Sequence, residues 1–196
     1  MTTTPESQPV GDSATKTPLL SVRNLEVTFK TEAGPHVAVR DVSFDVMPGQ
    51  TVAIVGESGS GKSMTGFSLL GLVEAPGQVV GGQVFFKGED LRTLDAERLR
   101  RLRGNRIAMI FQDPMMTLNP VLRIDTQMIE TLQAHQDISR AAAYERALEV
   151  LVEVGIASPA ERLRAYPHQF SGGMRQRVAI AIALLNRPDL IIADEP

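Results

Sequence analysis

Gly56-Glu57-Ser58-Gly59-Ser60-Gly61-Lys62-Ser63 is the stretch of this 196-residue sequence that decides its fold. It follows Thr51–Val55, a short β-branched run that we expect to be a buried strand, and it opens a helix expected over residues 61–73. Glycines let the backbone turn its N–H groups inward, and a helix N-terminus adds partial positive charge. The stretch therefore predicts a phosphate-binding loop between a strand and a helix.

Two side chains of this loop carry its chemistry. Lys62 is expected to reach the β- and γ-phosphates of a nucleotide, and the Ser63 hydroxyl is expected to ligate Mg²⁺. The alternative is a Gly/Ser-rich linker, which the strand before the loop and the helix after it disfavour.

The rest of the chain reads as an α/β domain with a helical insertion. Residues 1–18, rich in Thr, Ser, Pro and Gly, are expected to form a disordered tail. A helical pattern runs from about 123 to 170, with Ser139 as an N-cap, Gly155 as a C-terminal glycine, and Tyr144, Leu148, Leu151 and Val152 on one face. Further strands are expected over 19–29, 37–46, 83–86, 107–111 and 190–193, and further helices over 94–103 and 172–185.

Composition excludes several classes of protein. The net charge is −3 and the chain has no cysteine, so disulfides and thiolate metal sites are absent from it and nucleic acid is not an expected partner. No apolar run approaches the roughly 20 residues that span a bilayer, and the first residues do not have a signal-peptide pattern. A role at a membrane would therefore require another subunit.

An apolar strand ending in two acids supplies a second chemical signal, Asp194 and Glu195. A carboxylate at the end of a buried strand can hold Mg²⁺, and the next one can polarise an attacking water. A solvated turn is the alternative, because Asp-Glu-Pro is also good turn chemistry.

The third signal is Phe170-Ser171-Gly172-Gly173-Met174-Arg175-Gln176-Arg177. Two glycines at a helix start leave N–H groups open to an anion, and Ser171 adds a hydroxyl. Ser171 could equally be a simple N-cap followed by a turn, and the residues alone do not rank the two readings.

Taken together, the three motifs and Gln112, which follows an expected strand, resemble the ABC ATP-binding domains in order and spacing. The resemblance implies a P-loop fold of ABC type, with a mixed β-sheet core and an inserted helical subdomain, that binds ATP and Mg²⁺. It implies a head-to-tail dimer in which Ser171, Gly172 and Gly173 cover the nucleotide held by the partner. Gln112 would contact Mg²⁺ or the lytic water, and Phe29 would stack on adenine, although Phe29 is equally well explained as a core residue.

Residues 111–120 and 166–177 resemble the ATPases of oligopeptide, dipeptide and nickel importers. The resemblance implies a peripheral subunit on the cytoplasmic face of the cell membrane. Its partners would be a second ATPase subunit, identical or different, transmembrane permease subunits and, indirectly, a solute-binding protein. Met115, Met116 and Leu118 would contact the permease if exposed, or pack beneath their loop if not.

Two alternatives stay open. One is a soluble ABC ATPase acting on nucleic acid or ribosomes, which the acidic net charge does not favour. The other is a nucleotide-binding module without turnover. Family members continue beyond the two acids with a further strand and a switch histidine, whereas His36, His135 and His168 all lie upstream, so we expect the domain to be incomplete at its C-terminus.

Overall fold

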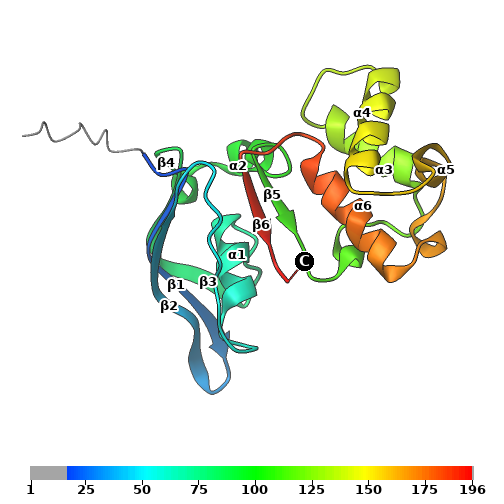
Figure 1. Ribbon diagram of the computed structural model, residues 1–196. Coiled ribbons are helices and arrows are strands. Elements are labelled where there is room, and N and C mark those ends of the chain that lie inside the picture. The colour runs from blue at the N-terminus through cyan, green and yellow to red at the C-terminus, as the bar shows by residue number, and fades with distance from the viewer. Residues whose placement is uncertain (1–16, 196) are drawn as a thin grey trace, which may run out of the picture.

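The computed structural model describes residues 17–195. Strands β1–β4 form one end of the molecule and helices α3–α6 the other, with β5 and β6 between them (Figure 1). We call β1–β6 with α1 and α2 the sheet lobe, and α3–α6 the helical lobe.

A four-stranded antiparallel sheet, in the order β2-β1-β3-β4, forms the outer part of the sheet lobe. The strands are β1 (Leu20–Thr31), β2 (Gly34–Val46), β3 (Gly77–Phe86) and β4 (Glu89–Asp90). Alternate residues of β1 are buried, among them Leu20 and Val22, because one face of the sheet packs on the lobe's core. Leu69 and Leu70, at the end of α1 (Lys62–Leu69), belong to the same core.

A separate pair of parallel strands forms the second sheet. β5 (Ile107–Ile110) pairs with β6 (Leu190–Ala193) in the register Ile107 to Leu190. Helix α2 (Ala96–Leu102) precedes β5 and is capped by the side chain of Asp95. This pairing brings the segments that end in Gln112 and Asp194 side by side, because parallel strands end at the same edge.

The helical lobe has its own hydrophobic core. Its helices are α3 (Ile124–Gln133), α4 (Arg140–Glu153), α5 (Pro159–Leu163) and α6 (Gly172–Leu184). Ser139 caps α4 by accepting a hydrogen bond from the N–H of Ala142, and Gly155 has a φ of 72° just after the helix, as its sequence position predicts. Short 3-10 turns at Leu91–Thr93, Pro114–Met116 and Pro167–Gln169 complete the fold.

The prediction of a buried strand over Thr51–Val55 is wrong. No strand is assigned there, and Val52, Ile54 and Val55 are 38%, 46% and 90% exposed. A strand requires a hydrogen-bonded neighbour, and no described strand pairs with this segment. Among the described strands β6 likewise pairs only with β5, and its Ile191 is 41% exposed, so β6 is less buried than its apolar sequence predicts.

Two smaller expectations also need correction. Helix α1 ends at Leu69 rather than near residue 73, because Gly71 adopts a φ of 61° and the N–H of Leu72 bonds back to the carbonyl of Phe67. Of the residues predicted for the core face of α4, Val152 is wrong, because it is 61% exposed, whereas Leu151 is buried and Tyr144 and Leu148 pack partly buried against the core. Ala143, Ala147 and Val150 complete the buried face.

The predicted tail, residues 1–18, lies almost wholly outside the described residues. The limits predicted for the helical subdomain stay a prediction, although α3, α4 and α5 all fall within them. Within residues 17–195, no helix combines the length and hydrophobicity needed to cross a bilayer.

Candidate functional site

The phosphate loop connects the extended segment Thr51–Val55 to helix α1. Gly59 and Gly61 have φ values of 80° and 94°, a region that side chains disfavour. A Cβ at Gly61 would also lie 2.4 Å from the carbonyl oxygen of Ala38 in β2, so glycine is required there for space as well as for conformation. Residues 56–60 are exposed, so their backbone is accessible to a ligand.

Lys62 is the first residue of α1, and its side chain folds back over the loop. Its Nζ donates hydrogen bonds to the carbonyl oxygens of Gly56 and Glu57, each at 3.0 Å. The same Nζ lies 3.7 Å from Oε1 of Glu195. The ammonium group is therefore held above the loop, where it can exchange carbonyl partners for anionic oxygens of a ligand.

Two further contacts join distant segments at this point. Oγ of Ser63 donates to Oδ1 of Asp194 at 2.9 Å, and Nε2 of Gln112 donates to Oε2 of Glu195 at 2.8 Å. Glu195 adopts a φ of 46°, which is uncommon for a residue with a side chain. The structure thus brings together Lys62, Ser63, Gln112, Asp194 and Glu195, all of which the sequence predicted to be functional.

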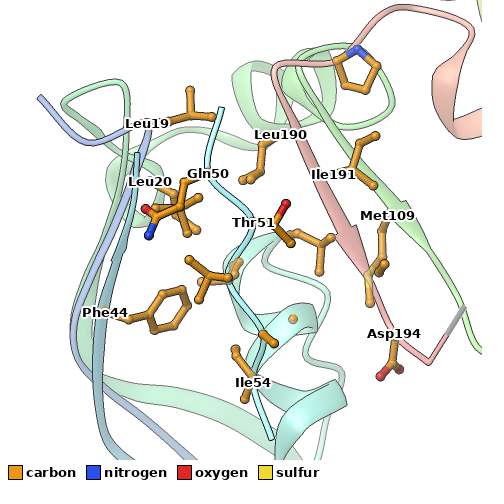
Figure 2. Close-up of a pocket in the computed structure, with 18 of the residues that line it drawn as sticks. Leu19, Leu20, Phe44, Gln50, Thr51, Ile54, Met109, Leu190, Ile191 and Asp194 are labelled. Atoms are coloured by element: carbon orange, nitrogen blue, oxygen red, sulfur yellow. The ribbon is translucent and has the colours of Figure 1, made fainter. Parts of the chain in front are cut away.

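A cleft of about 680 Å³ lies beside this cluster. Figure 2 shows it between the segment carrying Thr51 and Ile54 and strand β6 with Leu190 and Ile191, with Asp194 at one end. Lys62, Ser63 and Glu195 line the same cleft as Asp194, while Leu19, Leu20 and Phe44 line its apolar part. The cleft is therefore polar at the phosphate loop and apolar away from it.

Oxygen donors around the Ser63–Asp194 contact fit Mg²⁺. The two side chains are already in contact at 2.9 Å, and Gln112, whose Nε2 donates to the neighbouring Glu195, also carries an amide oxygen. In residues 17–195 no three His, Cys, Asp or Glu side chains form a metal cluster. This donor set suits an ion that keeps several waters and binds mainly through phosphate oxygens.

The residues around the third motif lie apart from the cleft. Ser171 caps α6 by accepting from the N–H of Met174 at 3.4 Å. Gly172 and Gly173 are exposed, and a Cβ on either would meet nothing within 4 Å. None of the three lines the cleft beside Lys62.

Phe29 lies in β1, where its ring packs closely over Gly77 of β3. It also joins the core of the sheet lobe and does not line the cleft. This packing suits the core alternative, and adenine stacking stays a prediction.

The three apolar residues considered in the segment after Gln112 differ in their exposure. Asp113 accepts a hydrogen bond from the N–H of Met115 and so starts a 3-10 turn. Met115 and Met116 are 37% and 67% exposed, whereas Leu118 is buried in the core of the helical lobe. Only the two methionines are available as a contact surface.

Comparison with known proteins fits this arrangement. A family model described as "ABC transporter" matches residues 39–196, which is most of the chain. The chain belongs to the ABC transporter family. The dimeric ATP-binding cassette MJ0796, solved in a post-hydrolysis state with ADP and Pi, matches 89% of the chain with a TM-score of 0.80 and 30% identity, over 73% of its own length. The predicted fold, a P-loop ABC cassette, is confirmed.

Two curated relatives of this ABC family chain are bacterial. The peptidoglycan transport ATP-binding protein YejF of Agrobacterium fabrum is 55% identical over 91% of the chain. The oligopeptide transport ATP-binding protein OppD of Escherichia coli is 49% identical, also over 91%. The chain spans 33% of the first relative's length and 52% of the second's.

Sequence reasoning missed the contribution of β2 and of two amide side chains. Ala38 constrains the loop at Gly61, and Gln136 and Asn186 bond to one another between the lobes. The glycine at residue 61 was a sequence signal for the close approach of Ala38. Isolated amides in turns have no sequence pattern, so the sequence carried no signal for Gln136 and Asn186.

Proposed function

We propose that this chain is the ATP-binding and hydrolysing part of an ABC importer for peptides. The observation that carries the proposal is the meeting of Lys62, Gln112 and Glu195 above the phosphate loop. Three motifs far apart in sequence supply a cation, an amide and a carboxylate at one place, which is the set that nucleotide hydrolysis needs.

ATP binds with its phosphates against residues 56–63. Lys62 exchanges the carbonyls of Gly56 and Glu57 for the β- and γ-phosphate oxygens, and the exposed backbone N–H groups of the loop add further donors. Binding at the start of α1 also benefits from the partial positive charge of the helix N-terminus.

Mg²⁺, when bound, neutralises charge that develops on the phosphates. Ser63, Asp194 and Gln112 would hold it through their oxygens. Glu195 accepts a proton from the attacking water, because its carboxylate lies beside both Lys62 and Gln112 and can be directed at the γ-phosphate. Gln112 orients that water and connects the site to the segment that follows it.

The nucleotide is sandwiched in a head-to-tail dimer. The exposure of Gly172 and Gly173 at the start of α6, outside the cleft of their own chain, supports a contact made in trans. MJ0796, a cassette of the same fold, is described as dimeric. Ser171, Gly172 and Gly173 then act on the γ-phosphate held by a second ATPase subunit.

The names of the two relatives, a peptidoglycan and an oligopeptide transport ATP-binding protein, support the import of peptides. Permease subunits would contact Met115 and Met116, place the protein on the cytoplasmic face of the membrane, and receive solute from a binding protein.

The experiment measures Mg-ATPase activity and uptake of a labelled peptide by the complete transporter in proteoliposomes. We expect hydrolysis to rise when peptide and its binding protein are supplied. Hydrolysis without any peptide uptake would contradict the importer assignment, and absence of ATP binding would contradict the assignment of the nucleotide site.

A further inference from the structure

A chain of two amide hydrogen bonds crosses the junction between the lobes. Nε2 of Gln136, which follows α3, donates to Oδ1 of Asn186 at 2.7 Å. Nδ2 of Asn186 then donates to the carbonyl oxygen of Gly104 at 2.9 Å. Asn186 is only 9% exposed, so its amide is a buried polar group with a partner on each side.

The three residues belong to three different parts of the fold. Gln136 is in the helical lobe, Gly104 is in the turn between α2 and β5 of the sheet lobe, and Asn186 is in the connection from α6 to β6. His135 packs on the same turn, because its Nε2 lies 3.5 Å from the place a Cβ on Gly104 would take. The Asn186 side chain thus links both lobes to the connection between α6 and β6.

The apolar contact across this junction includes two alanines and two isoleucines. Ala183 of α6 packs with Ala108 and Ile110 of β5, and Ile180 packs at their edge. Apolar contacts are not directional, whereas hydrogen bonds are, and a buried amide is costly to leave unpaired. The amide chain therefore adds directional contacts to this junction.

We propose that Asn186 is a positioning residue that sets the angle of the helical lobe on the sheet lobe. It follows α6, whose first residues are Gly172 and Gly173, and it precedes β6, which leads to Asp194 and Glu195. Its link to Gly104 also ties it to β5, which leads to Gln112. The effect on turnover rests on the function proposed above, in which the glycines of α6 contact a nucleotide.

The first test measures orientation without any nucleotide. The chain has no cysteine, so spin labels can be attached at Arg40→Cys on β2 and Ala141→Cys on α4, both exposed. The inter-label distance distribution is measured by double electron–electron resonance. Asn186→Ala and Gln136→Ala should broaden or shift it.

Gln133→Ala is the matched control. Gln133 also donates through Nε2, but to the carbonyl oxygen of Ile138 within the helical lobe, so its loss should leave the inter-lobe distribution unchanged. If Asn186→Ala does not fold, Gln136→Ala decides the question, because Gln136 is an exposed residue. Distributions equal to that of the unsubstituted chain in every folded variant overturn the proposal.

The second test uses the complete transporter. Asn186→Asp keeps an acceptor for Gln136 but loses the donor to Gly104, and it should lower kcat by about fivefold, the factor that corresponds to about 1 kcal/mol for one hydrogen bond. KM for ATP should change less, because Lys62 and its loop are untouched. A changed KM with an unchanged kcat contradicts the positioning role. Because the distance test needs no nucleotide, a transporter that proves inactive would refute the proposed function and leave this inference standing.

Discussion

Oγ of Ser63 donates a hydrogen bond to Oδ1 of Asp194 at 2.9 Å, although 131 positions of sequence separate the two residues. Pairing of β6 with β5 and the start of α1 at Lys62 bring the hydroxyl and the carboxylate together. A hydroxyl beside a carboxylate is a suitable pair of oxygens for Mg²⁺.

Asp194→Asn should therefore raise the Mg²⁺ concentration that gives half-maximal ATPase activity in the full-length protein. The amide keeps the size of the side chain but removes the charge that attracts the ion. A Mg²⁺ titration at fixed ATP measures the shift, with Asp137→Asn, an exposed acid of the helical lobe, as the control. An unaltered Mg²⁺ requirement would contradict the metal role.

Lys62→Ala should weaken ATP binding by roughly 10- to 100-fold, the range expected for hydrogen bonds to a charged group. The fold should survive, because the Lys62 side chain bonds to loop carbonyls and lies near Glu195 at the surface of the cleft. Titration with a fluorescent ATP analogue measures the affinity, and thermal melting checks the fold.

Lys30→Ala, which removes an exposed lysine of β1, should bind the analogue normally. Unchanged affinity and turnover in Lys62→Ala would refute the assignment of the phosphate loop.

Glu195→Gln should lower turnover of the full-length protein by roughly 10²- to 10⁴-fold, because an amide cannot act as the general base. ATP binding should persist, since the amide oxygen can still accept from Gln112. ATP should then hold the dimer closed, which size-exclusion chromatography with Mg-ATP detects. Near-normal hydrolysis with no dimer would count against Glu195 as the base, and Glu32→Gln at an exposed turn is the control.

Replacing Met115 and Met116 with Asp should impair peptide uptake while ATP binding by the isolated subunit stays normal. Both side chains are exposed in the turn after Gln112, and a charge there would disrupt an apolar contact with a permease. Val152→Asp, at an exposed apolar position on α4, is the matched control. Normal uptake by the reconstituted double variant would exclude the contact.

Folding stability should fall as the pH drops below about 6.5, the ordinary pKa of histidine. Burial, with a smaller effect from Arg100, lowers the pKa of His135 in the folded chain. The unfolded chain therefore binds a proton first, so stability is lost as the pH falls from 6.5 through the folded pKa. His135→Gln should flatten the dependence of Tm on pH between 5 and 8, measured by calorimetry.

His36→Gln should leave that pH dependence in place, because His36 is exposed on β2. An equal pH dependence in His135→Gln and the unsubstituted chain would show that His135 does not contribute.

Local chemistry determined several features directly. Glycines at residues 59 and 61 predicted a tight loop because few other residues tolerate its positive φ angles, and Ser139 and Ser171 predicted helix starts because their hydroxyls satisfy free N–H groups. These signals depend on neighbours within a few positions, so sequence alone is sufficient for them.

Tertiary structure decided the rest. Thr51–Val55 has the composition of a strand, yet it forms none, because strand formation depends on a hydrogen-bonded partner that no local pattern supplies. Likewise, the motifs predicted that Lys62, Gln112 and Glu195 act together, but only the packing of α1 against β5 and β6 decided that Glu195 lies between the other two. No sequence pattern pointed to Asn186, because its proposed role depends on burial between two lobes that come together only in the folded chain.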